Sequence, residues 1–385
     1  MIVKIIEAFR DLLLGFLPKF FCKPFLNQGA EFAFLCHPLD ARDAARKYPF
    51  VKGISEKWFQ LWVQSFWPVL GSPVIGPQKA RQKLDSKGWV VICPYSPEIM
   101  VRNPDQARKM ILWSIRLCEK LGVKLIALGG YNSIITRDGN DLIGKTKLAV
   151  TTGNTYSALL VIQNLKKIAG ELSIPLSGLK VGVVGAAGSV GTACSTILPS
   201  LVKELWLMDL NGRELKVLAD DLTKQFNNVF VFQSLSEIKL FDVVITVTST
   251  PRAIVHAEDV RPGMIFIDAA QPYNVSEELP KEREDVLVIS SGIAKLPRLT
   301  CEIDLGPFES EVYACIGEAI ALTCFDQYEN YSIGKVKADQ VFKLEKIVTE
   351  LDFRVADFRN SAGFISKEQL ETFRSRYFLK YHEYK

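Results

Sequence analysis

The glycine-rich segment VGVVGAAGSVGTA constrains the fold of this chain more than any other feature. Gly185, Gly188 and Gly191 follow a run of β-branched residues and precede a helical pattern. Glycines at this spacing allow a tight turn and let the backbone approach a pyrophosphate, whose charge is met by amides at the helix N-terminus. The segment therefore predicts a dinucleotide site. Its expected contact residues are Gly185, Ala186, Gly188, Ser189, Val190 and Gly191.

Strands and helices alternate around this segment. A helix is expected at 154–172, and buried-type strands are expected at 229–232, 243–247, 264–268 and 286–289. This alternation predicts an α/β protein with a Rossmann-type, doubly wound parallel sheet.

The length of 385 residues is enough for more than one domain. We expect an N-terminal α/β substrate domain at 1–153 and a Rossmann dinucleotide-binding domain at 154–300, which includes the connecting helix. A mostly helical C-terminal region is expected at 301–385.

An acidic residue bears on the choice of dinucleotide. Asp209 lies 18 residues after Gly191, at the end of the second predicted strand, where a carboxylate accepts hydrogen bonds from ribose hydroxyls. A 2′-phosphate there would meet a like charge, so NADH is favoured, while the guanidinium of nearby Arg213 keeps NADPH possible. Thr248 and Ser249 follow a later strand, where they either contact nicotinamide and ribose or simply end the strand.

Charge, cysteine and histidine content exclude several classes of protein. Lys plus Arg (47) and Asp plus Glu (43) nearly cancel, so nucleic acid is not an expected partner. The three histidines are far apart and the eight cysteines form no CxxC pair, so we expect neither a metal site nor a His-based triad. Free thiols without a secretory leader fit a reducing cytoplasm.

Two apolar stretches bear on membrane contact. Charges interrupt the N-terminal 26 residues, so these fall short of the ~20 apolar residues of a membrane span. Their helix either packs on its own domain or lies peripherally in a membrane interface. The second stretch, 58–78, is core, a wall for a fatty substrate, or a membrane-touching patch. Its expected apolar helix face consists of Trp58, Phe59, Trp62, Phe66 and Trp67.

Several motifs together resemble one family. The segments are ALGGYNSI (127–134), TTGNTYSA (151–158), VGVVGAAGSVGTA (181–193), FIDAAQPYN (266–274) and VYACIGEAIAL (312–322). In this order they resemble the long-chain fatty acyl-[acyl carrier protein] reductases of cyanobacteria and related bacteria. That resemblance extends from about Gln28 to about Phe353. It implies reduction of a long-chain acyl thioester to a fatty aldehyde with a nicotinamide cofactor.

The resemblance also implies a catalytic cysteine. In the family a cysteine within a segment like F-A-C-x-A-E-A takes the acyl group, and the matching residue is Cys315. A thiolate suits this role, because attack on a thioester exchanges one sulfur leaving group for another. By periodicity alone Cys315 is a buried apolar residue. Glu318 lies one turn further, in an orienting, proton-handling, surface or capping role.

Two further motifs carry the candidate substrate residues. The bare backbone of Gly129 and Gly130 would allow an acyl chain or the nicotinamide to approach, and Thr152 and Asn154 would hold a thioester carbonyl. Turn and capping duty explains both motifs equally well. The chain departs from the family after the second strand, where it reads Asp209-Leu210-Asn211 instead of A-R-N, and in its loop, AAGSVG instead of ATGDIG.

The expected partner is an acyl carrier protein or a coenzyme A thioester. An acidic carrier would meet the basic run of Lys335, Lys337, Lys343 and Lys346, unless these residues form an ordinary solvated face. Two rival functions remain open. One is an NAD(P)-dependent dehydrogenase of a small polar substrate, similar to shikimate or methylene-tetrahydrofolate dehydrogenases. The other is a non-catalytic nucleotide-binding module at a membrane.

Overall fold

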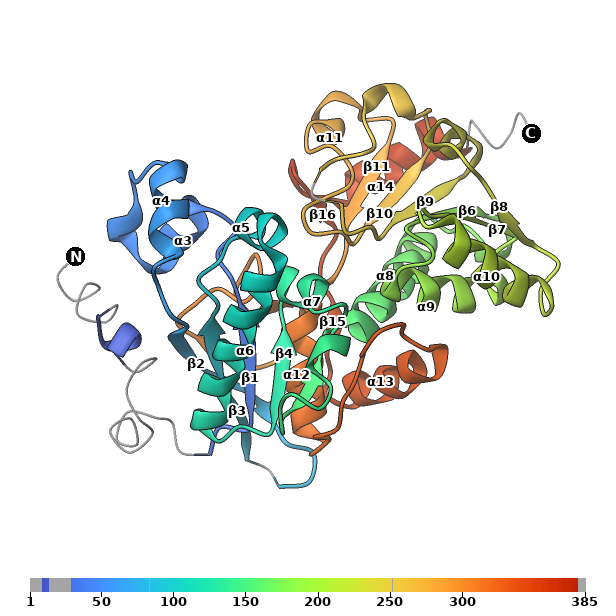
Figure 1. The fold of residues 1–385 in the computed structure, drawn as a ribbon. Helices are drawn as coiled ribbons and strands as arrows, with labels where there is room; N and C mark the ends of the chain where they lie inside the picture. Colours follow the sequence, from blue (N-terminus) through green and yellow to red (C-terminus); the bar gives the residue numbers. More distant parts are fainter. Residues whose placement is uncertain (1–8, 14–28, 83, 251, 380–385) are drawn as a thin grey trace. The chain divides into compact units, whose positions relative to one another are not determined.

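The computed structural model describes residues 9–13, 29–82, 84–250 and 252–379 (Figure 1). The chain forms two compact units. Unit 1 contains Met1–Gly153, Lys295–Gly334 and Ile347–Phe353, and unit 2 contains Asn154–Ala294, Lys335–Lys346 and Arg354–Lys385.

The residues after 300 divide between the two units, whereas the sequence reading gave them a region of their own. They are also less helical than expected, because the pattern that begins at Glu311 is a short strand before it becomes a helix. Part of the chain after residue 300 belongs to unit 1 because its apolar helix, Ala314–Cys324, is buried on nearly every side there. The pattern of this segment is therefore that of a core helix.

Unit 1 is built on a mixed sheet with the strand order β13-β2-β3-β1-β4-β5. Strands β3, β1, β4 and β5 are parallel, and β2 pairs antiparallel with β3 and β13. The strands of this sheet are β1 (Phe32–Cys36), β2 (Val69–Gln78), β3 (Asp85–Ile92), β4 (Leu125–Leu128), β5 (Ala149–Thr151) and β13 (Thr300–Cys301). A further short strand of unit 1, β14 (Glu311–Tyr313), lies outside it. The helices of unit 1 are α3 (Ala41–Lys47), α4 (Glu56–Val63), α5 (Pro97–Arg102), α6 (Pro104–Leu121), α7 (Tyr131–Ile135) and α12 (Ala314–Cys324).

The two faces of this sheet are covered by different helices. Ala33 and Leu35 of β1 pack in one core cluster with residues of α6, such as Ile111. Side chains alternate along a strand, so Phe32 and Phe34 point to the opposite face, where α12 packs across β1 and β4. Figure 1 shows α6 and α12 on the two sides of the strands. The sheet is thus buried on both faces, and α12 reaches it from a distant part of the sequence.

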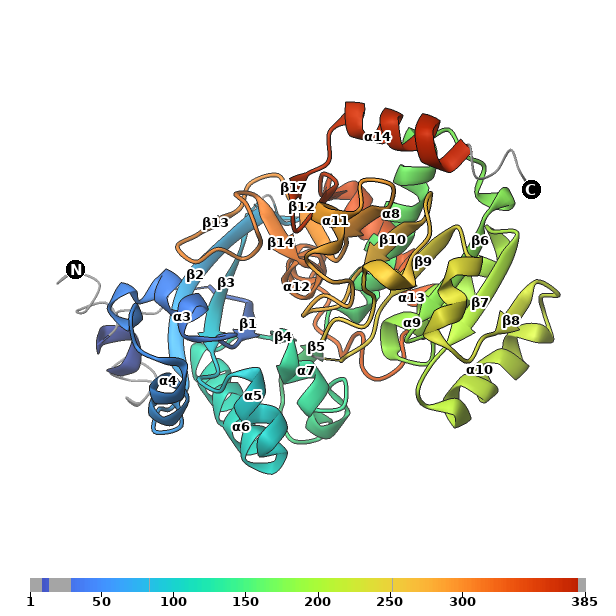
Figure 2. The same cartoon turned by 90° about the horizontal axis from the view of Figure 1, so that it is seen from above.

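Unit 2 confirms the predicted Rossmann-type sheet. All six strands are parallel, in the order β11-β10-β9-β6-β7-β8, which Figure 2 shows from β10 to β8. The strands of this sheet are β6 (Lys180–Val184), β7 (Glu204–Met208), β8 (Val229–Val231), β9 (Val243–Thr246), β10 (Ile265–Asp268) and β11 (Leu287–Ser290). Three short strands of unit 2 lie outside it: β15 (Arg354–Val355), β16 (Arg359–Asn360) and β17 (Gly363–Phe364). The helices of unit 2 are α8 (Asn154–Glu171), α9 (Ser189–Ile197), α10 (Gly212–Thr223), α11 (Leu279–Glu282) and α14 (Lys367–Phe373). Strand β12 (Ile293–Lys295) and helix α13 (Ala338–Glu350) run across the unit boundaries.

The strand order of unit 2 reverses between β6 and β9. The chain adds strands outward on one side from β6 to β8, and then returns to build β9 to β11 on the other side. Ligands of open parallel sheets bind beyond the carboxyl ends of the strands at such a switch point. The glycine segment follows β6 and Thr248 follows β9, so both lie at this point.

The Trp-rich stretch folds differently from expectation. Helix α4 ends before Phe66 and Trp67, because the proline that follows Trp67 disfavours a continued helix and the chain enters β2. Within α4, Phe59 is buried, whereas Trp58 is 69% and Trp62 is 43% exposed. The five aromatic residues therefore do not share one face.

Residues 9–13 are the described part of the predicted N-terminal helix. Asp11 is buried there and pairs with Lys47 Nζ at 3.0 Å. Trp67 Nε1 donates to the carbonyl of Leu12 at 2.8 Å, so this segment packs on unit 1, with Phe9 exposed. The rest of the predicted helix, with Cys22, lies outside the described residues. No helix in the described ranges is both long and apolar enough to cross a bilayer.

Candidate functional site

The glycine loop of unit 2 has no room for side chains at two of its glycines. A Cβ at Gly191 would lie 2.0 Å from the carbonyl oxygen of Gly185. Gly185 has φ +90°, and a Cβ there would lie 2.9 Å from the backbone of Val247. At Gly188 the corresponding distance, to the oxygen of Gly185, is 3.3 Å, and the residue is exposed at the start of α9. The loop is therefore compact and leads directly into a helix N-terminus, as a pyrophosphate site requires.

The remaining predicted loop residues differ in accessibility. Ala186 is buried, whereas Ser189 and Val190 are half-buried in the first turn of α9. The buried residue shapes the turn, and the two half-buried ones are partly open to solvent.

Asp209 lies beside this loop, directly after β7. Its Oδ2 accepts the backbone N–H of Ala187 at 2.9 Å, and its Oδ1 accepts that of Asn211 at 2.8 Å. A carboxylate has about four acceptor positions, so two remain for ribose hydroxyls. Arg213 is exposed in the first turn of α10. The geometry thus places a carboxylate against the glycine loop, whereas Arg213, four residues further along the chain, is open to solvent.

A polar cluster lies at the carboxyl ends of β9 and β10. Thr248 donates to Asn274 Oδ1 from its backbone N–H at 3.2 Å and from its hydroxyl at 2.8 Å. The Nδ2 of the buried Asn274 has no hydrogen-bond partner among the described residues. Ser249 is exposed. The sequence reading included the FIDAAQPYN motif but gave no role to Asn274, because its pairing with Thr248 spans 26 residues.

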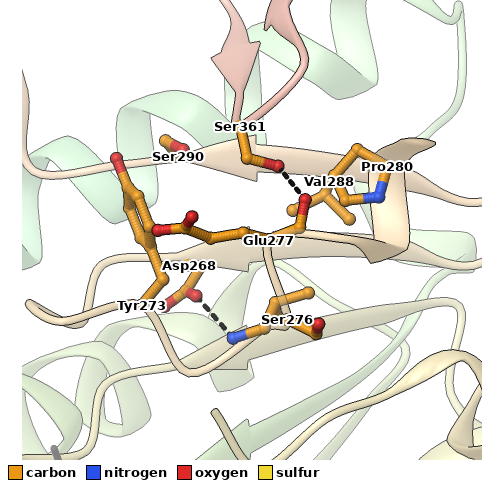
Figure 3. Close-up of a pocket in the computed structure, with 9 residues that line it drawn as sticks. Asp268, Tyr273, Ser276, Glu277, Pro280, Val288, Ser290 and Ser361 are labelled. Atoms are coloured by element: carbon orange, nitrogen blue, oxygen red, sulfur yellow. Dashed lines mark hydrogen bonds between the residues drawn. The ribbon is translucent and has the colours of Figure 1, made fainter. Parts of the chain in front are cut away.

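Asp268 anchors the same motif. Burial raises the pKa of its carboxyl to about 6, against hydrogen bonds from the backbone N–H groups of Val275 and Ala270, which lower it. Figure 3 shows Asp268 in a small pocket with the side chains of Tyr273 and Glu277. The remaining lining residues are Val275, Ser276, Pro280, Val288, Ser290 and Ser361. Asp268 thus holds the loop that carries Asn274.

Cys315 is the second residue of α12 in unit 1. It is the only residue of this helix that is not buried. Burial of the thiol group raises its pKa to about 12, and the charge of Glu318 acts in the same direction. The backbone amides of Ile316, Cys315 and Gly130 act in the opposite direction. The sulfur is therefore a protonated thiol at neutral pH, at the donor end of a helix.

Two predicted glycine motifs meet Cys315. Gly153 has φ +80°, and a Cβ there would lie 2.2 Å from the Cα of Cys315. The Gly130 amide acts directly on the pKa of the Cys315 thiol. Gly129, directly after β4, packs against the ring of Phe34, where a Cβ would be 2.7 Å away. Residues from two other segments of the sequence thus lie against Cys315.

Glu318 holds part of this arrangement from within the core. Its fully buried Oε1 accepts hydrogen bonds from the N–H of Gly153 at 3.1 Å, from Ser332 Oγ at 2.7 Å and from the hydroxyl of Thr151. A surface role for Glu318 is therefore wrong. Because it fixes Gly153, which contacts Cys315, it orients the site from one turn along α12.

The other predicted substrate residues are less available. Thr152 is buried and its hydroxyl donates to the carbonyl of Ser332 at 2.6 Å, so this proton is already used. Asn154 is half-buried and begins α8, at the first residue of unit 2.

The basic run is partly neutralised in the structure. Lys335 pairs with Glu214, and Lys343 pairs with Asp339 at 3.5 Å. Lys335 and Lys337 precede α13. The run is therefore not one continuous basic helix.

The structure adds His37, which sequence reasoning set aside. His37 directly follows β1, and its Nε2 accepts the N–H of Tyr131 at 3.0 Å. It is separated from Tyr131 by 94 residues, and only the pairing of parallel β1 and β4 brings them together.

The described part of the chain contains free thiols but no cluster of metal ligands. The seven cysteines there are free, and no group of three or more His, Cys, Asp or Glu residues is arranged to hold a metal ion. Cys36 and Cys301 share the partial exposure of Cys315, whereas the other four are buried.

The comparisons with known proteins agree with the nucleotide site. The shikimate / quinate 5-dehydrogenase family matches residues 166–290, which include the glycine loop and lie within unit 2. A long-chain acyl-[acyl-carrier-protein] reductase from Synechococcus elongatus is 24% identical over 312 residues, which cover 77% of this chain and 88% of that reductase. The chain is thus a distant relative of this cyanobacterial enzyme.

Two other similar proteins extend the comparison. The aminotransferase PigE of Serratia sp. is 26% identical over 282 residues, covering 70% of this chain and 32% of PigE. The chain therefore spans about a third of the length of PigE. The structure of L-tryptophan dehydrogenase from Nostoc punctiforme is 15% identical, with a TM-score of 0.38, and covers 84% of this chain and 81% of that one.

Proposed function

We propose that the protein is an NAD(P)H-dependent reductase of long-chain acyl thioesters, which forms a fatty aldehyde through a thioester at Cys315. One observation carries the proposal: residues of two motifs that resemble those of the reductase family, Gly130 of ALGGYN and Gly153 of TTGN, lie against Cys315 within unit 1. Neither motif adjoins Cys315 in the sequence, so their meeting is independent of the likeness that drew attention to them.

The residues of unit 2 fit a nicotinamide dinucleotide. The closed turn at Gly185 and Gly191 leaves the backbone free to approach a pyrophosphate, and Asp209 retains acceptor positions for ribose hydroxyls. Asn274 Nδ2 is a buried donor at the carboxyl edge of the sheet that has no partner among the residues described in the structure, so it would donate to the nicotinamide end. The negative charge at Asp209 favours NADH over NADPH. When bound, the nicotinamide supplies the hydride.

Cys315 performs the acyl transfer. Its sulfur attacks the carbonyl carbon of the acyl thioester, a new carbon–sulfur bond forms, and the carrier thiol leaves with the proton that Cys315 gives up. The N–H groups that act on the sulfur would also stabilise the negative charge that develops on the carbonyl oxygen during attack. After hydride addition at the same carbon, the carbon–sulfur bond breaks, which releases the aldehyde, and Cys315 takes up a proton from solvent.

The acyl donor in this proposal is an acyl carrier protein or coenzyme A thioester. A product with a long apolar chain favours peripheral membrane contact, and the exposed Trp58 and Trp62 of α4 offer side chains of the type found at membrane interfaces. The protein would then be cytoplasmic, with part of it at the membrane surface.

The proposal is tested by acylation of the enzyme. The purified protein is incubated with a long-chain acyl-coenzyme A, and the intact mass is measured before and after addition of NADH or NADPH. We expect the mass of one acyl group on the protein and its loss as aldehyde once the cofactor is added. Cys315→Ala should abolish both results, while Cys301→Ala, which removes another half-buried thiol of unit 1, should leave them unchanged. An acyl group that persists in Cys315→Ala would contradict the covalent mechanism.

A second candidate function rests on the match of residues 166–290 to the shikimate / quinate 5-dehydrogenase family. A dehydrogenase of a small polar substrate would use the same nucleotide site and would turn over without Cys315. The substrate site of such a dehydrogenase would also be lined by charged side chains, whereas most residues of α12, the helix that carries Cys315, are apolar. Turnover of such a substrate by Cys315→Ala would favour this function.

A further inference from the structure

We propose that His37 is a positioning residue of the Cys315 site and acts through the Gly130–Tyr131 peptide. This inference rests on the proposed function for its catalytic meaning, but the contacts that carry it are those of unit 1 alone.

The first step is the bond between His37 and α7. Nε2 of His37 accepts the N–H of Tyr131 at 3.0 Å, and Nδ1 lies 3.2 Å from the carbonyl oxygen of Pro38. A backbone N–H only donates and a carbonyl only accepts, so the proton of the neutral ring is on Nδ1. Burial also lowers the pKa of His37, which keeps the ring neutral. The imidazole thus presents a fixed acceptor to the start of α7.

The second step is the fit of Gly130 against the ring. Gly130 has φ +54°, and a Cβ there would lie 2.8 Å from His37 Nε2. The ring of Tyr131 stands edge-on to the imidazole, with centroids 6.0 Å apart. The imidazole therefore fixes the turn at Gly130 from one side by contact and from the next residue by a hydrogen bond.

The third step leads to the sulfur. Helix α12, which carries Cys315, packs against β4, the strand that leads directly into Gly129 and Gly130. The Gly130 amide is also one of the backbone groups that lower the pKa of the Cys315 thiol. An amide in this position stabilises negative charge on the thiolate or on the carbonyl oxygen during attack. Since a small displacement of such a donor greatly reduces its effect, a residue that fixes the turn controls the reactivity of Cys315 without touching the acyl group.

The test replaces the acceptor and then restores it. His37→Leu removes the acceptor for the Tyr131 N–H, and His37→Gln places an amide oxygen near the position of Nε2. We expect the rate at which Cys315 takes an acyl group from acyl-coenzyme A to fall about tenfold or more in His37→Leu and to recover in His37→Gln. His256→Leu, which alters an exposed histidine of unit 2, is the matched control.

A second readout separates this inference from the proposed function. Alkylation of Cys315 by iodoacetamide, located by peptide mass spectrometry, requires no acyl substrate. We expect it to slow about tenfold in His37→Leu and to recover in His37→Gln, because a displaced Gly130 amide stabilises the thiolate less and the pKa of the thiol then rises by about one unit. If wild-type protein is never acylated but the alkylation pattern holds, the reductase proposal fails and the role of His37 stands. Equal acylation and alkylation rates in His37→Leu and wild type would overturn it. So would a His37→Gln variant that folds like wild type, with an unchanged melting temperature, but is as slow as His37→Leu.

Discussion

The molecule contains two clusters of glycines, and they differ in where their members stand in the sequence. Gly185, Gly188 and Gly191 lie within seven residues and belong to one strand-to-helix turn of unit 2. Gly130 and Gly153 of unit 1 lie in separate segments and meet Cys315 only in the fold. Both clusters remove side chains so that a backbone can approach something closely. In unit 2 the backbone is expected to approach a ligand, whereas in unit 1 it approaches another part of the chain.

The two glycine clusters should differ in how strongly mutations elsewhere in the protein affect them. The loop in unit 2 is held largely by bonds within about 25 residues, such as those from Thr192 N–H to the carbonyl of Gly188 at 2.8 Å and from Ala187 N–H to Asp209 at 2.9 Å. The Cys315 site depends on Glu318, which holds Gly153 from 165 residues away in the sequence. A local turn survives changes elsewhere in the domain, whereas a site assembled from distant segments is coupled to the packing of the whole of unit 1.

The largest effects on the two sites are expected when a glycine of either cluster is replaced by alanine. Gly191→Ala places a Cβ 2.0 Å from the oxygen of Gly185, and Gly153→Ala places one 2.2 Å from the Cα of Cys315. Because the backbone must move in each case, we expect about 100-fold weaker NADH binding in the first variant and about 100-fold slower acylation of Cys315 in the second. Nucleotide fluorescence titration and intact mass measure these two effects.

Each of these variants is expected to leave the other site intact. Gly170→Ala in α8, where a Cβ meets nothing within 4 Å, is the control that should change neither property. If Gly153→Ala weakened NADH binding as much as Gly191→Ala does, the distinction between a local site and an assembled one would be lost.

The next largest effect concerns how the alkylation rate of Cys315 depends on pH. With a pKa near 12, its thiolate fraction, and hence its alkylation rate, should rise about tenfold per pH unit from pH 7 to 9, about 100-fold in all. A solvent-exposed thiol levels off near its ordinary pKa of ~8.5. Glu318→Gln removes a negative charge that raises this pKa, so the variant should react faster at pH 8 although it melts earlier.

The measurement is iodoacetamide alkylation with peptide mass spectrometry, combined with thermal melting. A plateau of the wild-type rate below pH 9 would contradict the burial of the thiol. Slower alkylation in Glu318→Gln at an unchanged melting temperature would contradict the assigned sign of the charge effect.

The smallest expected effect concerns cofactor choice at the local site. Asp209→Asn keeps an oxygen that accepts the Ala187 N–H but removes the charge that would repel a 2′-phosphate. We expect the ratio of NADPH to NADH affinity to rise about fivefold, since one screened charge contributes about 1 kcal/mol at such a distance. Arg213→Gln should shift the ratio in the opposite direction and by less, because this side chain is exposed. An unchanged ratio in Asp209→Asn would show that other groups select the cofactor.

The fold of unit 2 could be predicted because its signals are local. The strands predicted at 243–247 and 264–268 are β9 and β10, and the glycine segment forms the turn that its spacing requires. In unit 1 the prediction of one aromatic helix face over 58–67 is wrong, because the chain leaves the helix before its last two aromatic residues to enter β2. Helical periodicity describes a single helix and does not foresee where a strand takes over.

The candidate site was predictable only in part for the same reason. Gly130 and Gly153 could be selected as motifs, but their meeting with Cys315 depends on β4, β5 and α12 packing in unit 1. His37 carried no local signal, since a lone histidine after a strand is common and its bond spans 94 residues.

By itself, the sequence determined that unit 2 carries a parallel nucleotide-binding sheet, because the turn, its glycines and Asp209 are specified within about 30 residues. Only the tertiary structure decided the surroundings of Cys315. Cys315 lies in a helix whose apolar pattern predicts complete burial, yet it is the one residue of α12 that remains accessible. The physical reason is that exposure and electrostatics at Cys315 are set by Gly130, Gly153 and Glu318, and local periodicity contains no information about groups that come together across the fold.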